Sequence, residues 1–149
     1  MSEGTKESSI ESLYRGVIMD HYRRPSNRRA VADATHRVRC HNALCGDDLR
    51  LELKIKDGSV ADAGFDGEGC AISMAATSML TEMLVGKSVA QVEDLIRDFT
   101  RFITGAREGL DEEALEDLAA LAGVSHFPVR VKCALLPFSA IKETLSAPS

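Results

Sequence analysis

The chain has 149 residues, of which 44% are hydrophobic and 28% are charged, a composition typical of one globular domain with its own core. Its formal net charge of −5 at pH 7 argues against a nucleic-acid or anionic-membrane surface, because either would need a clustered basic face. We therefore expect protein or small-molecule partners, with no nucleic acid and no membrane, and a single domain over residues 1–149 with flexible ends at 1–8 and 146–149.

The N-terminal residues 1–9 are polar and lack the apolar centre of a signal peptide. No apolar run approaches the roughly 18 residues that are needed to span a bilayer. We therefore expect a cytoplasmic protein. In a reducing cytoplasm the four cysteines indicate metal binding or thiol chemistry rather than two structural disulfides.

Apolar residues at helical intervals predict a first helix between Ser8 and Pro25. Ser8 and Glu11 have the spacing of a capping box, and Leu13 and Val17 follow on one helical face. Pro25 ends this pattern. The polar residues 25–34 then predict a connecting loop.

Three strands are predicted next, over residues 37–41, 49–55 and 60–65. The second alternates leucine or isoleucine with polar residues, and an Asp57-Gly58 turn separates it from the third. The simplest arrangement is a three-stranded antiparallel meander. In a meander, the first connection and the end of the third strand lie at the same end of the sheet.

Helical patterns fill the rest of the chain. Cys70 precedes an apolar helical run over residues 71–86, and Ser88 with Gln91 begins a second amphipathic helix that ends at Gly105. Asp111 is expected to cap an acidic helix over 112–121 that carries no evident chemistry. Residues 127–133 should be extended, and the last helix should cover 134–145, with Pro137 in its first turn.

Three thiols and one carboxylate, on three separated segments, could together bind a metal ion. Cys45 and Asp47 lie two positions apart, so in an extended backbone both side chains leave on one side, and Gly46 lets the chain bend between them. Cys70 opens a helix, where the free amide groups favour a thiolate. With Cys133, these residues supply the four donors that a tetrahedral zinc ion requires.

Other residues could compete for this metal. Cys40 is the main rival, and His36, His41 and His126 are chemically capable ligands. If residues 37–41 form a strand, Cys40 and His41 face opposite sides, and we interpret Cys40 as a small buried apolar residue. The histidines are dispersed and lack the i, i+4 pairing of a metalloprotease site.

Three motifs in this order resemble the IscU/NifU-type iron–sulfur cluster assembly family, and its SufU branch most closely. They are Asn42 to Asp47, Gly67 to Met74 (Gly-Glu-Gly-Cys-Ala-Ile-Ser-Met) and Arg130 to Leu135 (Arg-Val-Lys-Cys-Ala-Leu), and the resemblance extends over about residues 13–145. It implies an α+β fold in which a three-stranded antiparallel sheet packs against several helices, with a metal site at one end of the sheet.

Within this family, IscU-type members are scaffolds for a [2Fe-2S] cluster, whereas SufU-type members bind zinc and accept persulfide sulfur from a SufS-type cysteine desulfurase. Lys132 stands where scaffolds usually have histidine, and residues 127–130 differ from their Leu-Pro-Pro-Val-Lys motif. The long segment between Gly86 and Cys133 also resembles SufU. Ala43, where proline is common, and the additional Cys40 depart from the family pattern.

The resemblance therefore implies a zinc-dependent sulfurtransferase that passes sulfur to downstream iron–sulfur assembly proteins. Cys45 is the expected acceptor, since it lies in a glycine-containing loop and can leave the metal more easily than Cys70. Arg130 and Lys132 are candidates for contacting a partner or orienting the site. Two alternatives stay open: a scaffold that carries a [2Fe-2S] cluster, and a structural zinc-binding interaction domain.

Overall fold

The computed structural model describes residues 15–43 and 46–146, so the expected flexible end at 1–8 lies outside the described residues, as do residues 147–149. Residues 15–23 are helical, which agrees with the described part of the predicted first helix. The remaining elements, in chain order, are β1 (His36–Asn42), β2 (Asp47–Lys56), β3 (Ser59–Glu68), α2 (Ala71–Leu84), α3 (Val89–Thr104), the 3₁₀-helix η1 (Glu113–His126) and α4 (Pro128–Ser146). No helix among these residues is both long and apolar enough to cross a membrane.

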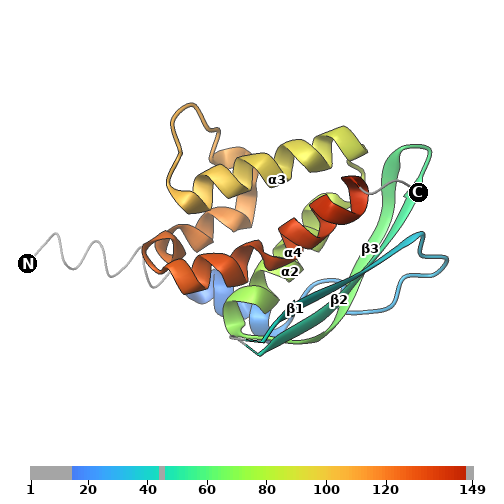
Figure 1. Cartoon of the computed structure of the whole chain (residues 1–149), viewed down its shortest axis with the longest axis horizontal. Helices are drawn as coiled ribbons and strands as arrows, with labels where there is room; N and C mark the ends of the chain where they lie inside the picture. The colour runs from blue at the N-terminus through green and yellow to red at the C-terminus, as the bar shows by residue number, and fades with distance from the viewer. Residues whose placement is uncertain (1–14, 44–45, 147–149) are drawn as a thin grey trace, which may run out of the picture.

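The predicted α+β class and the three-stranded antiparallel sheet are confirmed. The strands lie in the order β1-β2-β3, with antiparallel pairing throughout. Helices α2 and α4 pack on one face of the sheet, and α3 and η1 lie on the far side of these two helices (Figure 1). Asp57 and Gly58 both have positive φ, as a tight two-residue hairpin turn requires.

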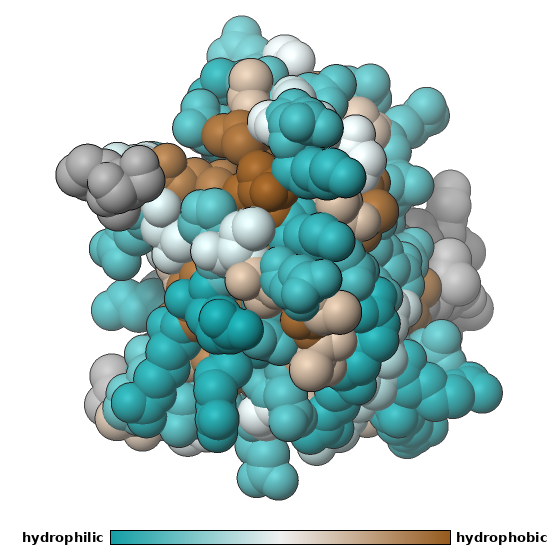
Figure 2. Space-filling view, turned by 90° about the vertical axis from the view of Figure 1, so that its right-hand side faces the viewer, coloured by the Kyte–Doolittle hydropathy of each residue, from teal (hydrophilic) through white to brown (hydrophobic). Residues whose placement is uncertain are grey.

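The core lies between the inner face of the sheet and the helices. Leu49, Leu51 and Leu53 of β2 are fully buried, as their alternation predicts. Phe99 of α3 stacks on Phe138 of α4 with ring centroids 4.3 Å apart, which joins the two helical layers. The end of the molecule that carries the β2–β3 turn is covered mainly by hydrophilic residues, with hydrophobic ones confined to smaller areas (Figure 2).

Each strand extends beyond its predicted bounds. Asn42 still pairs with Asp47, and Asp48 still pairs with Glu68, at the end of the sheet where β1 joins β2. These polar residues are paired through the backbone, which hydrophobic alternation does not mark. The extension makes Asp47 the first residue of β2 rather than part of a loop.

The start signals of the next two helices and the end signal of the second are confirmed, whereas α2 ends at Leu84 rather than continuing to residue 86. Cys70 is the N-cap residue of α2. Ser88 and Gln91 form a complete capping box at the start of α3, and Gly105 ends it in the left-handed region with a φ of 94°.

The predicted helix over residues 112–121 is present, but its predicted cap at Asp111 is wrong. The segment is the longer 3₁₀-helix η1, with Glu112 as its N-cap residue, and it is interrupted at Glu116 with a φ of 50° and a ψ of −128°. Four buried apolar residues recur every third position along it: Leu115, Leu118, Leu121 and Val124. After the interruption, a helix with three residues per turn places Leu118, Leu121 and Val124 on one face, whereas an α-helix would rotate them apart.

The prediction of an extended segment over 127–133 is also wrong. Helix α4 already begins at Pro128, whose fixed φ suits the first helical position, and the amide of Val131 donates to the carbonyl of Phe127 at 3.0 Å. Pro137 consequently lies inside the helix rather than in its first turn. It has no N–H to donate to the carbonyl of Cys133, its i−4 residue, and helices bend at such positions.

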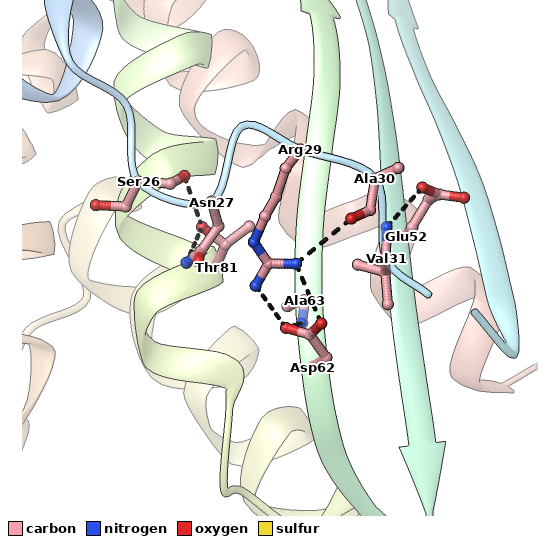
Figure 3. A network of polar contacts seen from close by, with 9 residues as sticks. All are labelled: Ser26, Asn27, Arg29, Ala30, Val31, Glu52, Asp62, Ala63 and Thr81. Atoms are coloured by element: carbon pink, nitrogen blue, oxygen red, sulfur yellow. Dashed lines mark hydrogen bonds and ion pairs between the residues drawn. The ribbon is translucent and has the colours of Figure 1, made fainter. Parts of the chain in front are cut away.

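Residues 25–31, which follow helix 15–23, cover the outer edge of β3. They begin beside α2 and cross this edge to the exposed face of the sheet (Figure 3). The amide of Phe65 donates to the carbonyl of Asn27 at 3.0 Å. Arg29 forms a two-pronged ion pair with Asp62, at 3.1 and 2.7 Å. A Cβ on Gly64 would lie 2.4 Å from the Arg29 carbonyl oxygen, so this close approach requires glycine.

Residues 86–89 cover the beginning of the same edge. The amide of Val60 donates to the Lys87 carbonyl at 2.8 Å, and the amide of Gly86 donates to the Val60 carbonyl at 2.9 Å. The connection between α2 and α3 therefore acts as a short additional partner for β3.

Candidate metal centre

Three of the four predicted metal ligands come together at one end of the sheet. Asp47 opens β2, Cys70 caps α2, and Cys133 lies in the second turn of α4. One ligand atom from each of the three lies within 4.8 Å of the others. The meander accounts for the meeting of Asp47 with Cys70, because the start of β2 and the end of β3 are paired neighbours, while α4 brings Cys133 to them. That these residues bind a metal stays a prediction.

Cys45, the predicted fourth ligand and sulfur acceptor, lies outside the described residues. The described chain stops at Ala43 and resumes at Gly46, which has a φ of 69°. Such a left-handed conformation favours glycine, in agreement with the predicted bend immediately before Asp47.

Asp47 is fully buried, and its two carboxylate oxygens have different surroundings. Oδ1 accepts hydrogen bonds from the amide of Cys70 at 2.7 Å and from the hydroxyl of Ser73 at 2.9 Å. Oδ2 is buried and has no hydrogen-bond partner among residues 15–43 and 46–146. Because a buried carboxylate oxygen without a partner is strongly unfavourable, Asp47 fits the role of a metal ligand through Oδ2.

The sulfur of Cys70 accepts a hydrogen bond from the amide of Ser73 at 3.4 Å, at the N-terminus of α2. The sulfur thus lies at the positive end of the helix dipole, with a backbone amide directed at it. Cys70 is half-buried, whereas Cys133 is buried. Two cysteine sulfurs with one carboxylate oxygen form a donor set that suits zinc.

Both glycines of the Gly67-Glu68-Gly69-Cys70 segment are required by close packing. A Cβ on Gly69 would lie 2.5 Å from Ser73 Oγ and 2.8 Å from Asp47 Oδ1. Gly67 has a φ of 111°, and a Cβ there would lie 2.3 Å from the carbonyl oxygen of Asp48. These glycines therefore allow β3 and the start of α2 to approach Asp47.

The structure corrects the expected setting of Cys133. It was expected just before a helix, but it lies inside α4, because the helix begins five residues earlier at Pro128. The backbone of Cys133 is therefore held by helical residues on both sides rather than at a helix start.

Cys40 is set apart from this group. It lies on β1 with 1% of its surface exposed, packed in the hydrophobic core, and burial raises the pKa of its thiol to about 12. A thiol with such a pKa is a poor ligand and a poor nucleophile at neutral pH. His36, His41 and His126 are likewise absent from the group of converging ligand atoms.

Arg130 and Lys132 are both exposed on the first turns of α4. Arg130 borders a groove of about 730 Å³ that also includes Ala71 and Ile72, the two residues after Cys70. Phe127, which is 61% exposed, also lines this groove. An apolar groove with a basic rim therefore lies beside the start of α2.

Sequence reasoning missed Ser73 and Gly69. The interval of three residues between Cys70 and Ser73 is that of an N-cap interaction and could have indicated their contact. The contact between Ser73 and Asp47 joins residues that are 26 positions apart and has no local signal.

Comparisons with known proteins identify the family of this chain. The family model described as NifU-like N terminal domain matches residues 13–134. The zinc-dependent sulfurtransferase SufU of Bacillus subtilis is 41% identical over 136 residues, which are 91% of each chain. The iron–sulfur cluster assembly scaffold protein IscU of Streptococcus pyogenes serotype M1 is 35% identical over 138 residues, which are 93% of this chain and 86% of that one.

Solved structures show the same fold. A putative iron–sulfur cluster assembly scaffold protein for the SUF system from Fervidobacterium islandicum AW-1 superposes with a TM-score of 0.80 at 28% identity, covering 87% of this chain and 94% of its own. A NifU-like protein from Brucella abortus has a TM-score of 0.79 at 20% identity, with 91% and 94% covered, and supports the fold alone. The named relatives thus divide between a sulfurtransferase and assembly scaffolds.

Proposed function

The chain belongs to the NifU-like N-terminal domain family of iron–sulfur cluster assembly, and from this premise we propose that it is a zinc-dependent sulfurtransferase. It accepts persulfide sulfur from a SufS-type cysteine desulfurase in the cytoplasm and passes it to downstream iron–sulfur assembly proteins. The observation that supports this proposal best is the buried Oδ2 of Asp47 beside Cys70 and Cys133, which has no hydrogen-bond partner in the described part of the chain. One carboxylate among cysteines suits zinc and matches the similarity to SufU.

Zinc, when bound, would hold its cysteine ligands as thiolates. Asp47, Cys70 and Cys133 would supply three donors, and Cys45 the fourth. Ser73 and the Cys70 amide hold Oδ1 of Asp47 by hydrogen bonds, so Oδ2 is the oxygen that would be available to the metal.

Cys45 is the proposed acceptor. Its thiolate attacks the outer sulfur of the desulfurase persulfide, forming a new S–S bond, while the original S–S bond breaks and the desulfurase cysteine leaves as a thiolate. The oxidation level is conserved, because the sulfane sulfur only moves from one cysteine to another. A thiolate on a downstream protein can take this sulfur from Cys45 by the same exchange.

Cys70 and Cys133 are less suited to this step. Cys133 is buried within α4, and Cys70 is tied to Ser73 at the start of α2. Moving either sulfur toward a partner would disturb packed helices, whereas Cys45 lies between the exposed Ala43 and Gly46.

We place the desulfurase contact over the end of the sheet that holds Asp47 and the adjoining groove. Arg130 on the groove wall and the nearby Lys132 provide positive charge on a chain of net charge −5. Opposite charge on the partner would speed association and orient it toward the cysteines.

The similarity to IscU supports a second candidate function, a scaffold on which a [2Fe-2S] cluster is assembled. A third, a structural zinc-binding interaction domain, needs no sulfur transfer. Metal analysis and the absorbance spectrum of the purified protein separate the scaffold from the other two. Stoichiometric zinc without colour agrees with the proposal, whereas brown protein with iron and sulfide would identify a scaffold.

The transfer step is tested with Cys45→Ser and, as a matched control, Cys40→Ser. Alanine production by a SufS-type desulfurase is measured with each variant, and mass spectrometry locates the added sulfur. The wild-type chain should stimulate alanine production by the desulfurase. Cys45→Ser should abolish this stimulation, because a serine hydroxyl is a poor substitute for the thiolate, while Cys40→Ser should retain it. Stimulation that survives in Cys45→Ser, with added sulfur on Cys40, would refute the mechanism.

A further inference from the structure

A second group of metal-binding side chains lies away from the cysteines. His21 comes from helix 15–23, Glu82 from α2 and Asp117 from η1, and one ligand atom of each lies within 4.8 Å of the others. Glu82 follows Cys70 by twelve residues along α2, a separation of about 18 Å at the helical rise. The two groups are therefore distinct.

His21 is the buried anchor of this cluster, with 7% of its surface exposed. Its Nδ1 lies 2.7 Å from Ser78 Oγ, and this oxygen accepts a hydrogen bond from the amide of Ser26 at 2.8 Å. Its Nε2 lies 2.9 Å from Oδ2 of Asp117. Histidines that bind metals usually have one ring nitrogen held by an oxygen in this way, so the other is presented to the ion.

The carboxylates around His21 form a negatively charged cluster that a cation would stabilise. Glu82, Glu116 and Asp117 border a cavity of about 160 Å³ together with Met79 and Met83. None of these three carboxylates forms an ion pair with lysine or arginine within residues 15–43 and 46–146. Nε2 of His21 contacts only one of the three carboxylates, that of Asp117, which leaves like charges facing the same space.

A hydrogen bond from the preceding loop also holds the carboxylate of Glu82 in position. Ser26 Oγ donates a hydrogen bond to its Oε1, and the amide of the same serine donates to Ser78 Oγ. The loop after helix 15–23 therefore positions both the imidazole and one carboxylate of the cluster. The adjoining cavity has room for an ion with one or more bound waters.

We propose that His21 Nε2, Glu82 and Asp117 bind a divalent first-row transition-metal cation, with water completing its coordination. One imidazole and two carboxylates suit Mn²⁺, Fe²⁺ or Zn²⁺ better than a soft ion such as Cu⁺. The ion would link helix 15–23, α2 and η1, and would fix η1 on the rest of the domain. This site is independent of the proposed sulfur transfer.

Mn²⁺ is the probe, because it prefers oxygen and nitrogen ligands and competes poorly with zinc for thiolates. Binding to the protein as purified is measured by loss of the free Mn²⁺ signal in electron paramagnetic resonance. Glu82→Gln and Asp117→Asn each remove one ligand charge from an exposed side chain, so the fold should be retained. Glu113→Gln, also exposed and on η1, is the matched control.

We expect one Mn²⁺ site in the wild-type chain, at least about tenfold weaker in both ligand variants and unchanged in the control. Saturating Mn²⁺ should also raise the melting temperature of the wild type but not that of Glu82→Gln. No binding by the wild type at millimolar Mn²⁺, or equal binding by both ligand variants and the control, would overturn the proposal.

Discussion

Ser73→Ala tests how the fold orients the candidate metal ligand. The substitution removes the hydroxyl that donates to Oδ1 of Asp47 at 2.9 Å but keeps the amide that donates to Cys70 Sγ. Asp47 then has one fixed hydrogen bond instead of two, so its Oδ2 is held less firmly toward the cysteines. The helix cap survives, and the fold should too.

The expected loss can be estimated in two ways. A hydrogen bond to a charged group contributes about 1.5–3 kcal/mol. If all of that is lost from zinc binding, affinity falls about 10- to 100-fold, since about 1.4 kcal/mol corresponds to a factor of ten. Substitutions of residues that orient metal ligands also typically weaken binding about 10- to 100-fold. The two estimates agree.

The assay is competition for zinc with a chromophoric chelator, and Ser139→Ala, an exposed serine of α4, is the control. Thermal melting of the metal-free variants shows separately whether the fold has been weakened. An affinity change below about twofold for Ser73→Ala, well short of the usual range for such residues, would refute the inference that Ser73 orients Asp47. An equal loss in the control would refute it as well.

Three other outcomes can be measured on the same protein. Asp47→Ala should lose zinc on dialysis against a chelator, whereas Cys40→Ala should retain it; metal content decides, and equal losses would mean that the ligand set is wrong. Gly69→Ala should weaken zinc binding and lower the melting temperature, because the new Cβ meets Ser73 Oγ at 2.5 Å and Asp47 Oδ1 at 2.8 Å; unchanged affinity would contradict this packing. Cys40 should resist alkylation at about pH 8 until the chain is unfolded, as peptide mass spectrometry can show, because burial raises its pKa to about 12. Because the folded state favours the neutral thiol of Cys40, the free energy of unfolding should fall as pH rises through the alkaline range toward 12. In Cys40→Ala this part of the pH-dependent fall should be absent.

Local patterns in the sequence were enough to predict the sheet and two helix starts. The alternation in β2, the Asp57-Gly58 turn and the Ser88-Gln91 capping box each involve neighbouring residues, whose periodicity or spacing directly reflects backbone geometry. The convergence of Asp47 and Cys70 followed from the meander alone, because it depends only on which ends of the strands are adjacent.

The errors arose where two geometries share similar residues. The interval of three between Leu115, Leu118 and Leu121 was present in the sequence, but short apolar intervals also occur in α-helices. Pro128 can end an extended segment or open a helix, and only the packing of α4 distinguishes them.

The contacts of Ser73 and of His21 could not be predicted. Ser73 reaches Asp47 across 26 positions, and His21 reaches Asp117 across 96. Such pairs depend on how helices pack against one another, which leaves no periodic signal in either segment. His21 consequently did not stand out from the sequence, although it is the most buried of the four histidines.

Residues 25–31, which cover the outer edge of β3, determine how this protein should aggregate when it is heated. Without residues 25–31, the amide of Phe65 would lose its partner, Asn27, and present a free strand edge to solvent. Another copy of the chain could then add a strand there. Since Arg29 is an exposed side chain paired with Asp62, high salt weakens one of the bonds that hold this cover in place. Aggregation should therefore begin from molecules in which this segment has detached while the rest of the domain is still folded.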